Sequence, residues 1–352
     1  MLEPQTGAGR AGERPAHGGD LAFARREFPG APQPWLDLST GVNPCAYPFR
    51  APPSEALTRL PEPQALAELE AAARLAFGAP SRVEAVAGAG AQALISWLPR
   101  LLGARRVAVL GVSYAEHALA FFRAGAEVAT AATLDELEDF DAAVVVNPNN
   151  PDGRMIEPAR LVVLAARLAK KGASLIVDEA FADFCGPAAS LVPLMPLDGV
   201  IVLRSFGKAY GLPGLRLGFA LCGGAMADRL RAALGPWPVA GPALDIGRQA
   251  YKDTDWLAGA GARLAGEAAA LDGLLAAAGI TVAGRTPLFR LVDAPNGARL
   301  FARLAREGIW TRRFAHEERW LRLAIPAGER QRARLREALR GEVVPVSGAG
   351  RP

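Results

Sequence analysis

The chain has 352 residues, of which 51% are hydrophobic and 22% are charged, and its formal net charge is +4. This is the composition of an ordinary globular protein, long enough for one large or two moderate domains. Because the net charge is small and no basic stripe interleaved with aromatic residues is present, we expect no nucleic-acid partner.

The sequence gives no indication of a membrane protein, a disulfide framework or a metal site. No apolar run reaches membrane-spanning length, and the N-terminal residues lack the hydrophobic region of a signal peptide, so we expect a cytoplasmic protein. The three cysteines are widely spaced, which is typical of reduced thiols. The three histidines, His17, His117 and His316, lie far from one another and from the cysteines in the sequence, so no metal ligand set is expected.

The chain begins with segments that show no periodic core face. Residues 1–16 are rich in glycine, proline and polar residues and are predicted to be a disordered tail. Residues 17–63 are predicted to form an N-terminal arm, with a short helix at 21–28, a strand and turn at 35–47, and a proline-rich extended end. Because this arm has aromatic residues but no amphipathic period, we expect it to pack on a partner subunit.

Residues 64–244 alternate between amphipathic helices and short apolar strands. The predicted strands are 83–87, 106–110, 127–131, 142–146, 174–177, 200–203 and 215–219, and the predicted helices are 64–77, 93–102, 114–124, 157–171 and 226–234. This alternation predicts an α/β domain with a mainly parallel sheet that has helices on both faces. Ligands of such sheets bind at the carboxyl ends of the strands, where this chain carries its unusual residues.

Residues 245–340 are predicted to form a smaller α+β domain. A long alanine-rich helical region runs to residue 278. The predicted strands after it are 280–283, 288–292, 309–314 and 320–325, and the predicted helices are 297–307 and 329–339. The last residues, 341–352, are predicted to be a disordered tail.

Lys208 is the residue on which the chemical interpretation depends. It follows a buried strand in a glycine-rich turn, whereas Lys170 and Lys171 end a helix and Lys252 lies beside an acidic residue. An apolar setting favours the neutral lysine amine, which can form a Schiff base. The alternative is a surface lysine whose amine reaches water.

Phosphate binding is predicted at residues 88–92, between a strand and a helix, where backbone N–H groups and the helix dipole attract anions. Gly88, Gly90 and Ala93 also fit a dinucleotide fingerprint, but that fingerprint needs an acidic residue near the end of the next strand, where this chain has Leu110-Gly111. A tight turn without a ligand is the other alternative.

Three more strand ends carry groups that suit a planar cofactor. Tyr114 can stack on a ring, although a core tyrosine is the simpler interpretation. Asn150 lies in a segment that is a strong turn signal in its own right. Asp178 ends a wholly apolar strand, where burial alone would favour the neutral acid, so it needs a strong partner such as a protonated ring nitrogen.

These residue types together suit pyridoxal 5'-phosphate. This cofactor needs a lysine for its aldehyde, a carboxylate for its ring nitrogen, a donor for its phenolate oxygen, an aromatic face and a phosphate cradle. The candidates are Lys208, Asp178, Asn150, Tyr114 and the cradle residues Gly90, Ala91 and Gln92, with Ser205 and Arg216 as further phosphate contacts.

Four motifs of the chain resemble those of fold-type I pyridoxal-phosphate enzymes, the aspartate aminotransferase superfamily. They are NPNNPDG (147–153), VDEAF (177–181), SFGK (205–208) and GLRLGF (214–219). The resemblance runs from about His17 to Leu339. It implies that Lys208 binds the cofactor covalently, that Asp178 holds the ring nitrogen and that Asn150 holds the phenolate oxygen. Arg322, in WLRLAIP, matches the arginine that grips the substrate carboxylate; the alternative is an exposed arginine on an edge strand.

Within this superfamily the chain is most similar to the histidinol-phosphate aminotransferases and the related L-threonine-O-3-phosphate decarboxylases of cobalamin biosynthesis. The segments similar to the decarboxylases are HGGD (17–20), WLDLSTGVNP (35–44), SYAEHALAF (113–121) and DEAFADF (178–184). This similarity implies that His17 helps to bind a substrate phosphate and that Asn43 contacts substrate. It also implies that Tyr47 reaches the cofactor phosphate of the neighbouring subunit in a homodimer.

Two positions depart from the pattern of relatives. Gln92 stands in the cradle loop where relatives often carry an acidic or small polar residue nearby. Phe181, counted with the cofactor-binding residues, replaces a tyrosine of many aminotransferases.

The resemblance therefore predicts a homodimeric pyridoxal-phosphate lyase that acts on a phosphorylated amino acid. The expected reaction is decarboxylation of L-threonine O-3-phosphate to (R)-1-aminopropan-2-ol O-phosphate. One alternative is an aminotransferase of the histidinol-phosphate type. Another is a non-catalytic cofactor-binding regulator, but such proteins usually carry a DNA-binding domain, for which residues 1–16 are too short.

Overall fold

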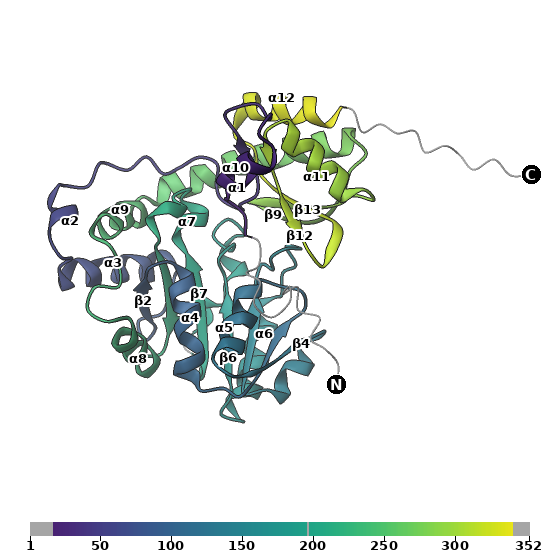
Figure 1. Cartoon of the computed structure of the whole chain (residues 1–352). Coiled ribbons are helices and arrows are strands. Elements are labelled where there is room, and N and C mark those ends of the chain that lie inside the picture. Colours follow the sequence, from purple (N-terminus) through teal and green to yellow (C-terminus); the bar gives the residue numbers. More distant parts are fainter. Residues whose placement is uncertain (1–16, 196, 341–352) are drawn as a thin grey trace, which may run out of the picture. The chain divides into compact units, whose positions relative to one another are not determined.

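The computed structural model describes residues 17–195 and 197–340, which form two compact units (Figure 1). The large unit is Cys45–Ala262, and the small unit combines residues 17–44 with residues 263–340. The predicted disordered tails, 1–16 and 341–352, lie outside the described residues.

The large unit is built on a seven-stranded sheet with the order β2-β8-β7-β6-β5-β3-β4. Its strands are β2 (Glu84–Gly88), β3 (Arg106–Leu110), β4 (Glu127–Ala131), β5 (Ala142–Val146), β6 (Ser174–Asp178), β7 (Val200–Ser205) and β8 (Gly218–Cys222). Strands β3 to β7 pair in parallel, whereas β8 is antiparallel to both β7 and β2. The predicted mainly parallel α/β sheet is confirmed.

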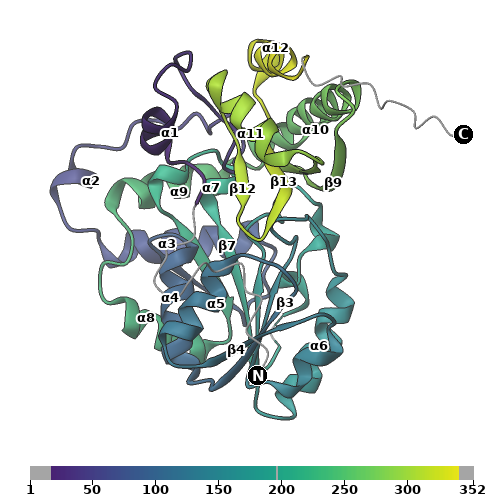
Figure 2. The same ribbon diagram turned by 45° about the vertical axis from the view of Figure 1, so that its right-hand side comes forward.

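Helices cover both faces of this sheet (Figure 2). Successive residues of a strand pack in different cores, one on each face of the sheet. On β5, for example, Val144 packs in the core that contains α4 (Ala91–Leu102), α5 (Ala115–Arg123) and α8 (Gly224–Leu234). Its neighbour Val145 packs in the core that contains α3 (Pro63–Ala76), α6 (Pro158–Ala169) and α9 (Gly241–Lys252). Burial on both faces explains why the central strands are continuous apolar runs.

The small unit carries a four-stranded antiparallel sheet with the order β12-β13-β10-β9. Its elements are α1 (Leu21–Glu27), β1 (Leu36–Asp37), β9 (Thr281–Thr286), β10 (Phe289–Asp293), α11 (Gly297–Arg306), β11 (Ile309–Trp310), β12 (Arg312–Phe314), β13 (Glu317–Ala324) and α12 (Gly328–Leu339). The single strand expected at 309–314 is two strands, because β11 pairs with β1 whereas β12 pairs with β13.

The boundaries between the two compact units differ from the domain boundaries expected at residues 63/64 and 244/245. Residues 17–44 join the small unit because β1 pairs in parallel with β11. Helix α9 belongs to the large unit because Leu244 and Tyr251 are buried in its core. The boundary at residue 262 falls inside the continuous helix α10 (Thr254–Ala277). The sequence pattern of this helix does not change at the boundary.

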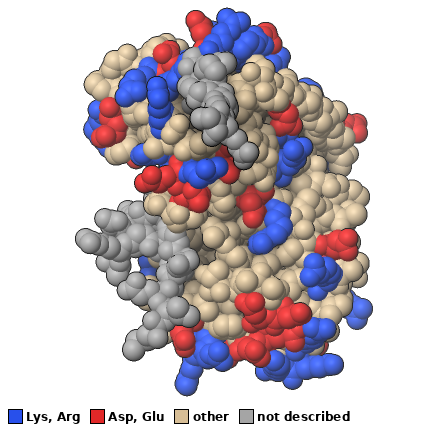
Figure 3. Space-filling model, turned by 90° about the vertical axis from the view of Figure 1, so that its right-hand side faces the viewer, with Lys and Arg blue, Asp and Glu red and all other residues tan. Residues whose placement is uncertain are grey.

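Two short elements complete the large unit, α2 (Glu55–Thr58) and α7 (Phe206–Ala209), which follows β7 directly. Within the described part of the chain, no helix has the length and apolar content needed to cross a bilayer. On the face shown in Figure 3, basic and acidic side chains are interspersed.

Candidate active site

Asp178 lies at the carboxyl end of β6 and is 3% exposed. Its Oδ2 lies 2.8 Å from Nε2 of His117, and its Oδ1 accepts a hydrogen bond of 2.9 Å from the backbone N–H of Ala180. Because both carboxylate oxygens are engaged and the group is buried, Asp178 is held in one orientation.

His117 is a further candidate site residue, and the sequence does not indicate it, because it lies far from the other histidines and from the cysteines along the chain. It lies on α5 and is buried, 61 residues before its carboxylate partner. The ring centroids of His117 and Tyr114 are 6.0 Å apart, edge to face. The spacing of three residues along a helix was an available signal that Tyr114 and His117 share a face. The long-range contact with Asp178 had no sequence signal.

Lys208 lies on α7 and is half-buried. Its Nζ lies 5.3 Å from the centroid of the Phe181 ring, which is itself buried. The turn is tight, because a Cβ on Gly207 would lie 2.6 Å from Cα of Pro213. Ser205, at the end of β7, and Lys208 are therefore placed by one strand and the short helix after it.

The predicted phosphate cradle lies where β2 ends and α4 begins. Gly90 has φ of 80° and caps the twelve-residue helix, which starts at Ala91. A Cβ on Gly90 would lie 2.7 Å from Nη2 of Arg216, and a Cβ on Gly218 would lie 2.3 Å from the backbone N of Ala91. Arg216 thus holds its guanidinium against the N-terminus of α4, and both attract an anion.

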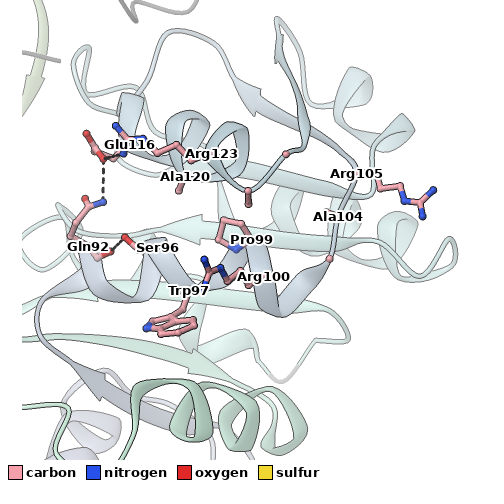
Figure 4. Close-up of a pocket in the computed structure, with 13 residues that line it drawn as sticks. Gln92, Ser96, Trp97, Pro99, Arg100, Ala104, Arg105, Glu116, Ala120 and Arg123 are labelled. Carbon is pink, nitrogen blue, oxygen red and sulfur yellow. Dashed lines mark hydrogen bonds and ion pairs between the residues drawn. The ribbon is translucent and has the colours of Figure 1, made fainter. Parts of the chain in front are cut away.

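Gln92 connects two side chains of the site. Its Oε1 accepts a hydrogen bond of 3.1 Å from the hydroxyl of Tyr114, and its Nε2 donates to Oε2 of Glu116 at 3.3 Å. Figure 4 shows Gln92 and Glu116 facing each other at one end of a cavity of about 660 Å³ between α4 and α5. Gln92 therefore holds the tyrosine whose ring is the candidate for stacking.

The segment after β5 is braced by its first two asparagines. Asn147 exchanges two hydrogen bonds with the backbone of Ile156, at 3.0 and 2.8 Å. Asn149 donates to the carbonyl of Val112 at 3.0 Å and accepts from Ser113 at 2.7 Å. The half-buried Asn150 follows this braced segment.

A buried ion cluster joins the ends of β6 and β7, and it was also missed from the sequence. Arg204 is 5% exposed, and its Nη1 lies 2.9 Å from Oε2 of Glu179, which is 0% exposed. Its Nη2 lies 2.5 Å from Oδ1 of Asp183. Burial raises the pKa of the Glu179 carboxyl, and Arg204 opposes that rise.

Tyr47 belongs to the large unit. Its ring packs edge to face on Trp256, with centroids 5.1 Å apart, and its hydroxyl donates to Oδ2 of Asp253 at 3.3 Å. Burial, followed by the charge of Asp253, raises the pKa of the Tyr47 hydroxyl. Its expected contact with a neighbouring subunit stays a prediction.

In the small unit, Arg322 is buried at 7% exposure on β13, between β12 and β10. The alternative of an exposed arginine on an edge strand is therefore wrong. Its Nη2 donates to the backbone carbonyl of Ser39 at 3.0 Å. The exposed His17 begins the turn that packs on Ser39, and Asn43 is buried at 4% exposure in the same unit.

The donor set of the large unit fits pyridoxal phosphate. The closely packed glycine turn beside Arg216 leaves no room for a Cβ and exposes a helix N-terminus to an anion. A buried carboxylate and a half-buried lysine follow adjacent parallel strands, β6 and β7. These are the groups that a phosphate, a basic ring nitrogen and an aldehyde require.

The chain is similar to known proteins over most of its length. Residues 50–340 match the model of the family described as aminotransferase class I and II. The chain is 45% identical over 329 residues to a threonine-phosphate decarboxylase of Pseudomonas aeruginosa, covering 92% of this chain and 97% of that protein. It is 41% identical over 328 residues to a threonine-phosphate decarboxylase of Sinorhizobium sp., again covering 92% and 97%.

The solved structures that resemble the chain share its fold. The histidinol-phosphate aminotransferase of Clostridium acetobutylicum has a TM-score of 0.77 at 22% identity, covering 87% of this chain and 98% of that one. The L-threonine-O-3-phosphate decarboxylase of Porphyromonas gingivalis has a TM-score of 0.69 at 18% identity, with the same coverage. At these identities the likeness concerns the fold, which is of fold type I.

Proposed function

The chain belongs to the aminotransferase class I and II family, and from this premise we propose that it is a pyridoxal-phosphate-dependent threonine-phosphate decarboxylase. The observation that carries the proposal is the identity of 45% and 41% with two decarboxylases over 92% of the chain. The reaction converts L-threonine O-3-phosphate to (R)-1-aminopropan-2-ol O-phosphate and carbon dioxide, a step of cobalamin biosynthesis.

The residues of the large unit would each take one role toward the cofactor. Lys208 would hold the aldehyde, Asp178 the ring nitrogen and Asn150 the phenolate oxygen. Tyr114 would cover the ring, while Ser205, Arg216 and the N-terminus of α4 would hold the phosphate. Pyridoxal phosphate, when bound, supplies the conjugated ring that accepts the electron pair left on Cα when carbon dioxide departs.

Asp178 and Lys208 would each control a proton, Asp178 the one on the ring nitrogen and Lys208 the one that Cα takes up when carbon dioxide leaves. The buried carboxylate of Asp178, fixed by His117 and the N–H of Ala180, would favour a proton on the ring nitrogen. The amine of Lys208, once the substrate amine has taken its place, would return a proton to Cα. The buried ring of Phe181 has its centroid 5.3 Å from that amine.

The small unit would supply the groups for the substrate. Arg322 would bind the carboxylate, and a buried arginine suits this role because it presents a planar pair of donors. His17 and Asn43 would contact the substrate on the side of its phosphate.

The direct test uses the purified protein with pyridoxal phosphate and threonine phosphate, with and without a 2-oxo acid. A decarboxylase releases carbon dioxide in both mixtures at the same rate. If carbon dioxide appears in neither mixture, the proposed function is wrong.

We also propose that the enzyme is a homodimer, with a cytoplasmic location as predicted from the sequence. The large unit leaves bulky apolar side chains exposed in residues 45–62, with Leu57 77% and Leu60 65% exposed, and Trp237 is 54% exposed. Such side chains commonly lie in interfaces between subunits. Sedimentation should give the mass of two chains, and Leu57→Asp with Leu60→Asp should shift it toward one chain. Wild-type sedimentation as a monomer at micromolar concentration would contradict a dimer.

A further inference from the structure

Ser39 contacts Arg322 and the turn that starts at His17, and it does so through different atoms. Its side chain is buried at 0% exposure. Its hydroxyl accepts a hydrogen bond of 2.7 Å from the backbone N–H of Gly19, in the turn that starts at His17. Its backbone carbonyl accepts a hydrogen bond of 3.0 Å from Nη2 of Arg322.

Asp37 fixes the orientation of this serine. Its Oδ1 accepts hydrogen bonds from the backbone N–H of Ser39 at 2.8 Å and from the Ser39 hydroxyl at 2.6 Å. Since the hydroxyl has one hydrogen, which it donates to Asp37, it can act only as an acceptor toward Gly19. Asp37 in turn belongs to β1, which pairs with β11. The acceptor for the turn is therefore anchored to a strand.

The turn at residues 17–20 packs closely against Ser39. A Cβ on Gly18 would lie 2.3 Å from the backbone oxygen of Ser39, the same oxygen that Arg322 contacts. Gly19 has φ of +91°, in the region that favours glycine. Asp20 then accepts from the N–H of Phe23 at 2.8 Å and caps α1. The turn is thus held by Ser39 on one side and by α1 on the other.

We propose that Ser39 is a positioning residue that sets the separation between the turn at residues 17–20 and Arg322. A fixed separation selects a substrate whose phosphate and carboxylate lie at a matching distance on one carbon skeleton. The inference rests on the proposed function, because it assigns the phosphate to the turn and the carboxylate to Arg322.

The Ser39→Ala variant tests the inference because it removes only the hydroxyl and keeps the backbone carbonyl for Arg322. Two probes separate the two ends of the substrate: 1-aminopropan-2-ol phosphate lacks the carboxylate, and threonine lacks the phosphate. Calorimetry on the holoenzyme should show the first probe binding about tenfold more weakly, since one buried N–H loses its acceptor. Threonine should bind within about twofold of wild type. With threonine phosphate, KM should rise by more than kcat falls.

Two alanine variants of glycines in the same segment serve as a matched pair. Gly18→Ala forces its Cβ against the Ser39 carbonyl and should weaken both probes. Gly30→Ala, where nothing lies within 4 Å of the added Cβ, should leave both unchanged. If Ser39→Ala weakens both probes equally, or neither, Ser39 is a packing residue and the inference is wrong. If the wild-type enzyme releases no carbon dioxide from threonine phosphate, that result contradicts the proposed function rather than the role of Ser39.

Discussion

At the scale of single residues, Asp178 tests whether the ring nitrogen must stay protonated. Asp178→Asn keeps the shape of the side chain but removes the charge, so the cofactor should stay bound while turnover falls by a factor on the order of 10² or more. Turnover per bound cofactor, with the cofactor measured by absorbance, is the readout. The exposed Asp198→Asn is the control and should behave as wild type. Near-normal turnover of Asp178→Asn would show that this carboxylate is structural.

Lys208 should be the point of covalent attachment of the cofactor. The holoenzyme is expected to be yellow, and borohydride reduction followed by peptide mapping should place the cofactor on Lys208. Lys208→Ala should remove the reducible attachment, whereas Lys252→Ala should keep it. Label on Lys170, Lys171 or Lys252 in the wild-type protein would overturn the assignment.

The sequence predicted these two residues because each stands in a local pattern with a chemical meaning. Lys208 is a lysine in an apolar turn, and Asp178 is a carboxylate at the end of an apolar strand. It did not predict that His117 would contact Asp178, because that contact joins α5 to β6 across the fold. The hydrogen bonds of Gln92 with Tyr114 and Glu116 were hidden for the same reason.

At the scale of elements, Arg204 tests how the ends of β6 and β7 are held together. Arg204→Met would leave the carboxylate of Glu179 buried without its cation, which typically costs about 3–5 kcal/mol. Urea denaturation of the holoenzyme should show this loss at pH 8. The surface variant Arg319→Met, whose arginine is 51% exposed and pairs with Asp293, should lose much less stability, because solvent screens this pair.

The loss in Arg204→Met should depend on pH in a defined direction. Burial raises the pKa of Glu179 in the folded protein, and removal of the arginine raises it further. A carboxyl whose folded pKa lies above its unfolded pKa binds a proton on folding, so its penalty grows as pH rises above the unfolded value. Arg204→Met should therefore be destabilised less at pH 5 than at pH 8. An equal loss at both pH values would show that Glu179 is not the group affected.

The elements themselves were predicted well where their patterns are long. The strands of the large unit are continuous apolar runs, and the sequence showed them. Short strands carry too few residues for a pattern: β1 and β11 have two residues each, and their pairing decides which unit contains residues 17–44. The boundary inside α10 was hidden because the helix continues across it.

At the scale of the whole molecule, the open choice is between loss of carbon dioxide and transfer of the amino group. Phe181 bears on this choice, since many aminotransferases of the superfamily carry a tyrosine there. Its ring centroid lies 5.3 Å from Nζ of Lys208 and brings no hydroxyl, so under the proposed function Asn150 would be the main donor to the phenolate oxygen. Both reactions need the ring as an electron sink, so Phe181 alone does not decide between them.

The reaction is decided by which bond of Cα stands perpendicular to the cofactor ring, and the placement of the substrate carboxylate sets that. Arg322 is buried and oriented by the carbonyl of Ser39, so in the proposed role it would offer the carboxylate one defined position. We therefore expect carbon dioxide from threonine phosphate without any oxo acid, and little amino transfer from histidinol phosphate. Arg322→Ala should abolish the release of carbon dioxide, whereas Arg319→Ala, on the exposed part of the same strand, should not. Efficient conversion of histidinol phosphate with 2-oxoglutarate, with no carbon dioxide from threonine phosphate, would make the protein an aminotransferase instead.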